Sequence, residues 1–250
     1  MTARVTGSDL ARMTARTLLL QATWNYERQQ GLGWAYCLAP VLERLYPDAA
    51  TRRARLAEHT GYFNTQPTLA SVALGAVARL EEQRAAGTVP DDDGVLRVKT
   101  MLGSALAAVG DRLFWFTLRP FVACLGVWLA LEHRWLGAVA LWLCYNAVHL
   151  TLRVCGVTWG YRRGPEVLGS GLRGRLERSV RLLAALGAAL VGVLVAALLV
   201  PGGEPQSLPF QATLAAGLAV GMLTAQHPRP SATYWALGAG ALCLAVAWFR

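Results

Sequence analysis

One stretch of about twenty residues places three charges inside a sequence that otherwise looks like membrane. Residues 102–121 read LGSALAAVGDRLFWFTLRPF and continue into an apolar run that ends at Leu131. At ~100° per residue, a helix puts four of these side chains in one sector about 100° wide, namely Asp111, Arg112, Trp115 and Arg119. A charge at mid-bilayer costs roughly 3 kcal/mol, so such residues normally face a protein interior or a watery path. The stretch predicts an internal Asp–Arg pair or a functional intramembrane site, and both remain open.

Composition supports a membrane protein. The chain has 250 residues, of which 54% are hydrophobic and 16% charged, and its mean hydropathy is +0.36. Soluble domains are about 45–50% apolar and about 25% charged, and this length allows several spans. The net charge of +9 comes from arginines beside apolar segments, which favours retention on the cytoplasmic side over binding of nucleic acid.

No arrangement typical of an enzyme or a metal site stands out. The five cysteines are scattered without CxxC spacing, and there is no His/Cys cluster, carboxylate pair or nucleophile–base arrangement. Residues 169–174, GSGLRG, match G-x-G-x-x-G, but an apolar helix precedes them instead of a strand, so a dinucleotide site is rejected. We expect no catalytic residue, no metal and no cofactor.

The segment order predicts an all-α, polytopic integral membrane protein with about four to five membrane-spanning segments. The N-terminal half is expected to form amphipathic and re-entrant helices, over residues 8–30, 40–46, 51–59 and 64–87. Glycine-rich residues 103–110 suit a bent or re-entrant segment. Spans are expected up to residue 131 and over residues 135–152, 182–200, 210–224 and 232–249.

Arginine placement predicts the orientation. Residues 153–181 carry seven arginines against two glutamates and are expected to form a cytoplasmic loop. Turns 132–134 and 201–209 then lie outside, and residues 1–100 form helices on the cytoplasmic side. Residues 101–250 form the membrane-spanning part of the same single subunit.

Two polar clusters in the N-terminal half attract attention. The first contains Asn25, Glu27 and Arg28 beside Trp24 and Tyr26. Composition alone favours an interfacial helix with aromatic anchors for it. The second, Asn64-Thr65-Gln66, stands at the mouth of an apolar helix that Gly87 closes. Its neutral amides and hydroxyl suit a sugar, although a plain capping turn would have the same sequence.

Together these blocks resemble the IID component of mannose/fructose/sorbose-type phosphotransferase sugar transporters. The matching motifs, in the family's order and spacing, are QATWNYERQQGLG at 21–33, LYP at 45–47, YFNTQP at 62–67, LEEQ at 80–83, Lys99 and GDRLFWFTLRP at 110–120. Gly156, Gly160, Tyr161 and Gly164 fall where the family has its glycine-tyrosine loop. The resemblance covers roughly residues 8–170.

The resemblance implies a multi-pass subunit of the bacterial cytoplasmic membrane. It would pair with a IIC subunit to form the sugar passage, while soluble IIA and IIB units carry the phosphate, so this chain itself would be no enzyme. Its contacts would be the IIC partner, a hexose-like sugar and membrane lipid. We predict that the sugar-facing residues are Asn64, Thr65, Gln66, Asp111 and Trp115. Structural or partner roles are predicted for Asn25, Glu27, Arg28, Arg112 and Arg119.

Arg112 departs from the family pattern, which tends to have a small residue or proline after the aspartate. A fixed cation beside the path leaves a second hypothesis, a non-transporting relative that acts as a membrane scaffold or regulator. Arg112 is expected to pair with Asp111, with Glu27 or with a carboxylate of the partner, because an unpaired buried cation is costly.

Overall fold

The computed structural model describes residues 3–89, 93–133 and 135–198. Regular structure in these residues is helical, and strand-like pairing is limited to isolated bridges of Gln29 with Asn25 and Phe63. The chain divides into two compact units. The first combines Met1–Arg119 with Trp142–Val180, and the second combines Pro120–Leu141 with Arg181–Arg250. The predicted all-α class is thus confirmed for the described residues, whereas the division near residue 100 stays a prediction.

The first helix is shorter than predicted. Helix α1 covers Gly7–Arg16, with Thr6 as its N-cap and Asp9 completing a capping box. A short 3₁₀ turn follows at Thr17–Leu19. The predicted helix over 8–30 is wrong beyond this point, because the Asn25 side chain accepts a hydrogen bond from the Arg28 amide at 2.8 Å and closes a local turn instead.

Helix α2 covers Gly31–Leu45 and forms the centre of the N-terminal part. The helix predicted over 40–46 lies within α2, but its predicted start is wrong because α2 already begins at Gly31. Gly31 and Gly33 lie in the first turn of α2, where neighbouring backbone leaves no room for a side chain. A Cβ on Gly33 would lie on the Leu20 carbonyl. Helix α3, Ala49–His59, begins at the Asp48 cap and agrees with the predicted helix over 51–59.

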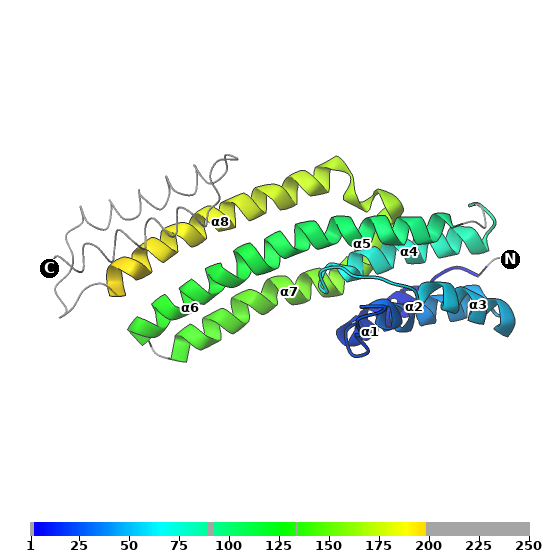
Figure 1. Cartoon of the computed structure of the whole chain (residues 1–250), viewed down its shortest axis with the longest axis horizontal. Coiled ribbons are helices and arrows are strands. Elements are labelled where there is room, and N and C mark those ends of the chain that lie inside the picture. Colours follow the sequence, from blue (N-terminus) through cyan, green and yellow to red (C-terminus); the bar gives the residue numbers. More distant parts are fainter. Residues whose placement is uncertain (1–2, 90–92, 134, 199–250) are drawn as a thin grey trace. The chain divides into compact units, whose positions relative to one another are not determined.

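Helices α4 and α5 form the next layer of the first unit. Helix α4, Ala70–Ala85, is buried along most of its length and packs against α2 and α5 (Figure 1). It ends before Gly87, whose φ of 68° confirms the predicted left-handed stop. Helix α5 covers Gly94–Leu113 as regular helix, so the predicted bend at 103–110 is wrong. Gly103 and Gly110 serve as close-contact points for the loop before α4.

The chain is helical from Gly94 to Leu131, through the π-helical segment Phe114–Leu118 and into α6, Arg119–His133. Helix α7 covers Trp135–Arg163, the 3₁₀ turn η3 covers Gly164–Leu168 and α8 covers Ser170–Leu198. The predicted loop over 153–181 is therefore wrong, since most of it is helical. In the described residues, Gly94–Leu131 and Trp135–Val167 are long and apolar enough to span a membrane. The spans predicted at 210–224 and 232–249 and the turn at 201–209 lie outside these residues.

Small residues let α7 approach α4 closely. A Cβ on Gly75 would lie on the Val157 carbonyl, and one on Gly160 would lie on the Val72 carbonyl. A Cβ on Gly156 would overlap the Ser71 side chain. This small-residue contact is typical of packing between membrane helices, and it fixes the register of α7 against the start of α4.

Candidate functional site

The predicted site begins with the loop between α3 and α4. Gln30 is buried and forms a reciprocal pair with this loop: its Nε2 donates to the Thr65 carbonyl at 2.7 Å, and its Oε1 accepts from the Thr65 amide at 3.2 Å. The Gln30 amide also donates to the Phe63 carbonyl at 2.8 Å. Phe63 is packed on Trp34 with ring centroids 4.1 Å apart. Residues 21–33 thus hold residues 62–67 through hydrogen bonds of the Gln30 backbone and side-chain amide.

The three predicted sugar-facing residues of this loop differ in accessibility. The Asn64 side chain is exposed, whereas Thr65 and Gln66 are buried. The buried hydroxyl of Thr65 has no partner among the described residues. Gln66 Oε1 accepts from the Thr68 amide at 2.7 Å and from the Leu69 amide at 3.1 Å. Gln66 therefore caps the turn that leads into α4, which supports the capping interpretation for this residue.

The structure brings this loop onto the glycine-aspartate motif of α5. A Cβ on Gly110 would overlap the Gln66 side chain, and one on Gly103 would press on Phe63. Asp111 is the residue next to this contact and is half-buried. Two motifs more than forty residues apart thus meet at one place in the first unit.

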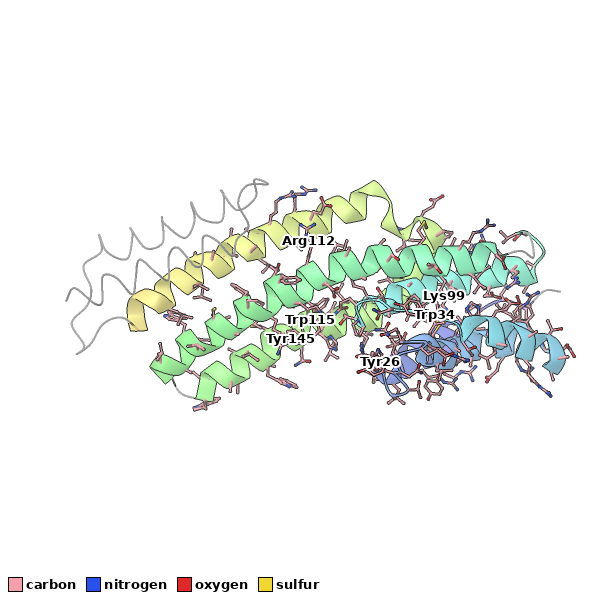
Figure 2. All side chains as sticks on the ribbon, viewed as in Figure 1. Tyr26, Trp34, Lys99, Arg112, Trp115 and Tyr145 are labelled. Atoms are coloured by element: carbon pink, nitrogen blue, oxygen red, sulfur yellow. The ribbon has the colours of Figure 1, made fainter. Side chains whose placement is uncertain are left out.

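Arg112, Trp115 and Arg119 are exposed, and no ion pair joins Arg112 to Asp111 among the described residues. The Arg119 guanidinium lies over the Trp115 ring, 5.2 Å from its centroid. Thr117 Oγ1 donates to the Arg112 carbonyl at 2.7 Å, which satisfies one carbonyl that the π-helical geometry leaves free. Arg112 and Trp115 are labelled in Figure 2.

The first polar cluster adopts a turn instead of a helix. Asn25 is a backbone cap within that turn. Exposed Glu27 has its ion pair with Arg28, at 3.8 Å. In the described structure Glu27 therefore does not supply the expected partner of Arg112.

Helix α7 adds a polar column that the motifs did not indicate. Tyr145, His149 and Arg153 follow at intervals of four residues and share one face. His149 Nδ1 and Thr68 Oγ1, in the turn before α4, are 2.8 Å apart. Arg153 is buried, and its Nη2 donates to the Pro67 carbonyl at 3.2 Å. The spacing was visible in the sequence, but no residue there indicated which neighbour the column would meet.

A network of buried charged and polar side chains links α3, α4 and α5. His59 Nε2 is 3.2 Å from Glu81, which also accepts from the Tyr46 hydroxyl at 2.8 Å. Burial alone would raise the pKa of Glu81, but the bonds from His59 and Tyr46 and the charge of Arg84 hold it below its usual range. The Lys99 ammonium donates to the His59 carbonyl at 3.0 Å and lies 5.5 Å from the centroid of the Trp34 ring. Lys99 and Trp34 are labelled in Figure 2.

These groups offer neutral amides, hydroxyls, one half-buried carboxylate and aromatic faces. Within the described residues, no group of three or more His, Cys, Asp or Glu side chains could hold a metal ion. Such a set binds an uncharged polyhydroxy ligand better than it activates a nucleophile. The long apolar helices place the chain in the class of helical membrane proteins.

The comparisons with known proteins identify the family. Residues 4–201 match the model of the PTS system mannose/fructose/sorbose family IID component. The chain is 37% identical over 193 residues to the mannose-specific EIID component of Escherichia coli K12, covering 77% of this chain and 68% of that protein. It is 38% identical over 192 residues to the sorbose-specific EIID component of Klebsiella pneumoniae, covering 77% and 70%. The chain belongs to the IID family.

Two solved structures resemble the chain. One, described as a membrane protein, has a TM-score of 0.73 at 31% identity, covering 98% of this chain and 94% of that chain. The other belongs to a cryo-EM structure of the mannose transporter ManYZ with microcin E492, and has a TM-score of 0.62 at 28% identity, covering 97% and 96%.

Proposed function

We propose that this chain pairs with a IIC subunit to form the sugar passage of a phosphoenolpyruvate-dependent phosphotransferase system. Family membership and the structural likeness to a chain of the ManYZ transporter support the pairing. Soluble IIA and IIB units would carry the phosphate, and the assembly would lie in the bacterial cytoplasmic membrane with several spans, in contact with lipid. The substrate would be a hexose-like sugar.

The observation that carries the sugar role is the contact between Gly110 and Gln66. It places the exposed amide of Asn64 and the carboxylate of Asp111 on two stretches that touch, so both can line one path. Carboxylate bonds to hydroxyls are charge-assisted and roughly twice as strong as neutral ones. The exposed Trp115 ring would serve the apolar face of a pyranose. In the state described here, Thr65 and Gln66 would contribute by holding the loop.

Uptake by the assembled complex tests this role. Asn64→Ala should raise the half-saturating sugar concentration about fivefold, because one hydrogen bond is worth about 1 kcal/mol, and Asp111→Asn should raise it further. Asn146→Ala is the matched control, since among the described residues that amide bonds to the Trp142 carbonyl of its own helix and to no other group. Complex yield should be unchanged. If both site variants transport with unaltered affinity and rate, this chain has no part in binding the sugar.

Exposed Arg112 favours the second candidate, a scaffold or regulator that does not transport. Within the described residues it has no carboxylate partner, so the partner subunit would have to supply one. Arg112→Ser separates the two functions. If the chain is a transporter with a structural Arg112, this variant should lower the stability of the complex. If the variant complex assembles but takes up none of a panel of hexoses, the scaffold is favoured.

A further inference from the structure

The α7 column touches both stretches assigned to the sugar. Its His149 bonds to Thr68, two residues after Gln66, with 2.8 Å between Nδ1 and Oγ1. The same imidazole meets the Phe114 ring edge-on at 6.3 Å between centroids, three residues after Asp111. One side chain therefore connects the loop before α4 with the turn that follows the glycine-aspartate motif.

The imidazole is held in a fixed orientation. Tyr145 stacks on it at 5.8 Å between centroids and 17° between planes, while Phe114 lies perpendicular to it at 89°. Stacked and edge-on aromatic contacts at these distances are the favoured arrangements of ring pairs. These two contacts hold the ring plane in which Nδ1 lies 2.8 Å from Thr68 Oγ1.

Arg153 holds the same loop one residue earlier. Its Nη2 donates to the Pro67 carbonyl at 3.2 Å, while its Nε is buried without a partner in the described part of the chain. A buried cation normally has a carboxylate beside it, since the charge is otherwise costly. Among the described residues no ion pair includes Arg153. Its visible role is the bond to Pro67, between Gln66 and Thr68.

We propose that His149 and Arg153 are positioning residues, which hold Pro67 and Thr68 so that the Asn64–Gln66 segment keeps the geometry that receives the sugar. This inference rests on the proposed function. Thr68 connects the two elements: its amide donates to Gln66 Oε1, and its hydroxyl bonds to His149. A shift of α7 would therefore displace Gln66 through this one residue.

A double-mutant cycle in the full complex tests the His149–Thr68 link. His149→Leu and Thr68→Val should each raise the half-saturating concentration about three- to tenfold, with little change in maximal rate or yield. The double variant should be no worse than the poorer single one, because both remove the same bond. Additive effects, or a loss of maximal rate without a change in half-saturation, would overturn the positioning role.

Arg153 is tested by its conservative variant, because Arg153→Leu is expected to unfold part of the unit. Arg153→Lys keeps the charge but loses the fork that reaches Pro67, and should raise half-saturation while the complex assembles. Hydrogen exchange of residues 64–69 should quicken in Arg153→Lys and His149→Leu but not in the Asn146→Ala control. Exchange as slow as in the wild type would overturn the inference.

The two proposals fail in different ways. If Asn64→Ala and Asp111→Asn shift half-saturation but the α7 variants do not, the positioning role is wrong and the sugar role stands. If all of them leave half-saturation unchanged for mannose, fructose and sorbose, the sugar role is wrong and the positioning role falls with it.

Discussion

At the scale of single residues, three buried charges are neutralised in three different ways. Asp9 pairs with arginines, Glu81 accepts from His59 and Tyr46, and Lys99 uses carbonyl groups and ring faces. Each solution follows from the high cost of an unpaired buried charge. These residues tie helices together.

Asp9 gives a prediction with a defined pH range. Burial would raise its pKa, but bonds from Thr6, Arg12 and Arg44 lower it to about 2, from an ordinary value of 3.8. A lowered pKa means that the carboxylate stabilises the fold above about pH 4 and that this contribution is lost as pH falls toward 2. Asp9→Asn should lower the melting temperature of the complex at pH 7 and flatten its pH dependence below 4. Parallel curves for variant and wild type would contradict this.

Lys99 gives the second prediction. Its ammonium donates to the His59 and Gly61 carbonyls at 3.0 and 3.4 Å, at the C-terminal end of α3, where the helix dipole favours a cation. Lys99→Met should cost about 2–3 kcal/mol, since hydrogen bonds to a charge are lost and the carbonyls stay buried. Denaturant unfolding of the complex measures this, with Thr100→Ala as the exposed neighbouring control. Equal stability of the two variants would mean that the clamp has no structural role.

At the scale of elements, the contact of α4 with α7 decides where the polar column lies. Gly75, Gly156 and Gly160 allow backbone-to-backbone approach, and this close register puts His149 opposite Thr68. A longer side chain in this contact would separate the helices and displace the column from the loop.

Gly160→Ala tests this contact. The added methyl would lie on the Val72 carbonyl, so overpacking should cost about 1–3 kcal/mol, and α7 should shift. Gly174→Ala is the control, because nothing lies within 4 Å of its Cβ and alanine favours a helix by about 1 kcal/mol. Melting temperatures and half-saturation should both worsen for the first variant only. A Gly160→Ala complex as stable as the control would show that α4 and α7 can separate without cost.

At the scale of the whole molecule, arginines gather at one end of the first unit. Arg79 and Arg84 lie in the last turns of α4, Arg97 lies in the first turn of α5, and Arg162 and Arg163 end α7. Tyr161 joins these ends through its bond to Glu82. The accumulation of positive charge favours the cytoplasmic side for this end, as the sequence predicted.

Cysteine labelling of intact cells tests the orientation. Ala86→Cys, an exposed position after α4, should react with an impermeant maleimide only after the cells are permeabilised. Trp135→Cys, 70% exposed at the start of α7, should react in intact cells. Both need a background without the five native cysteines. The opposite pattern would invert the orientation.

The sequence by itself determined the class of the protein and most of its helices. Long apolar runs require helices in lipid because every backbone polar group must be bonded within its own segment. A local signal was reliable where short-range chemistry decides, as at Gly87 after α4. The stretch 103–110 was misjudged because its glycines indicated a bend, although Gly103 and Gly110 are contact points inside a continuous helix.

Only the tertiary structure decided which segments meet. Gln66 lies on Gly110, Gln30 holds Thr65, and Arg153 reaches Pro67 across 86 positions of the chain. No periodicity or composition encodes such pairs, because they depend on packing between helices whose apolar faces would fit several neighbours. Residues 20–30 were predicted as helix, but the Asn25 side chain closes a local turn at the Arg28 amide, and the Gln30 amide then donates to the Phe63 carbonyl of a distant loop.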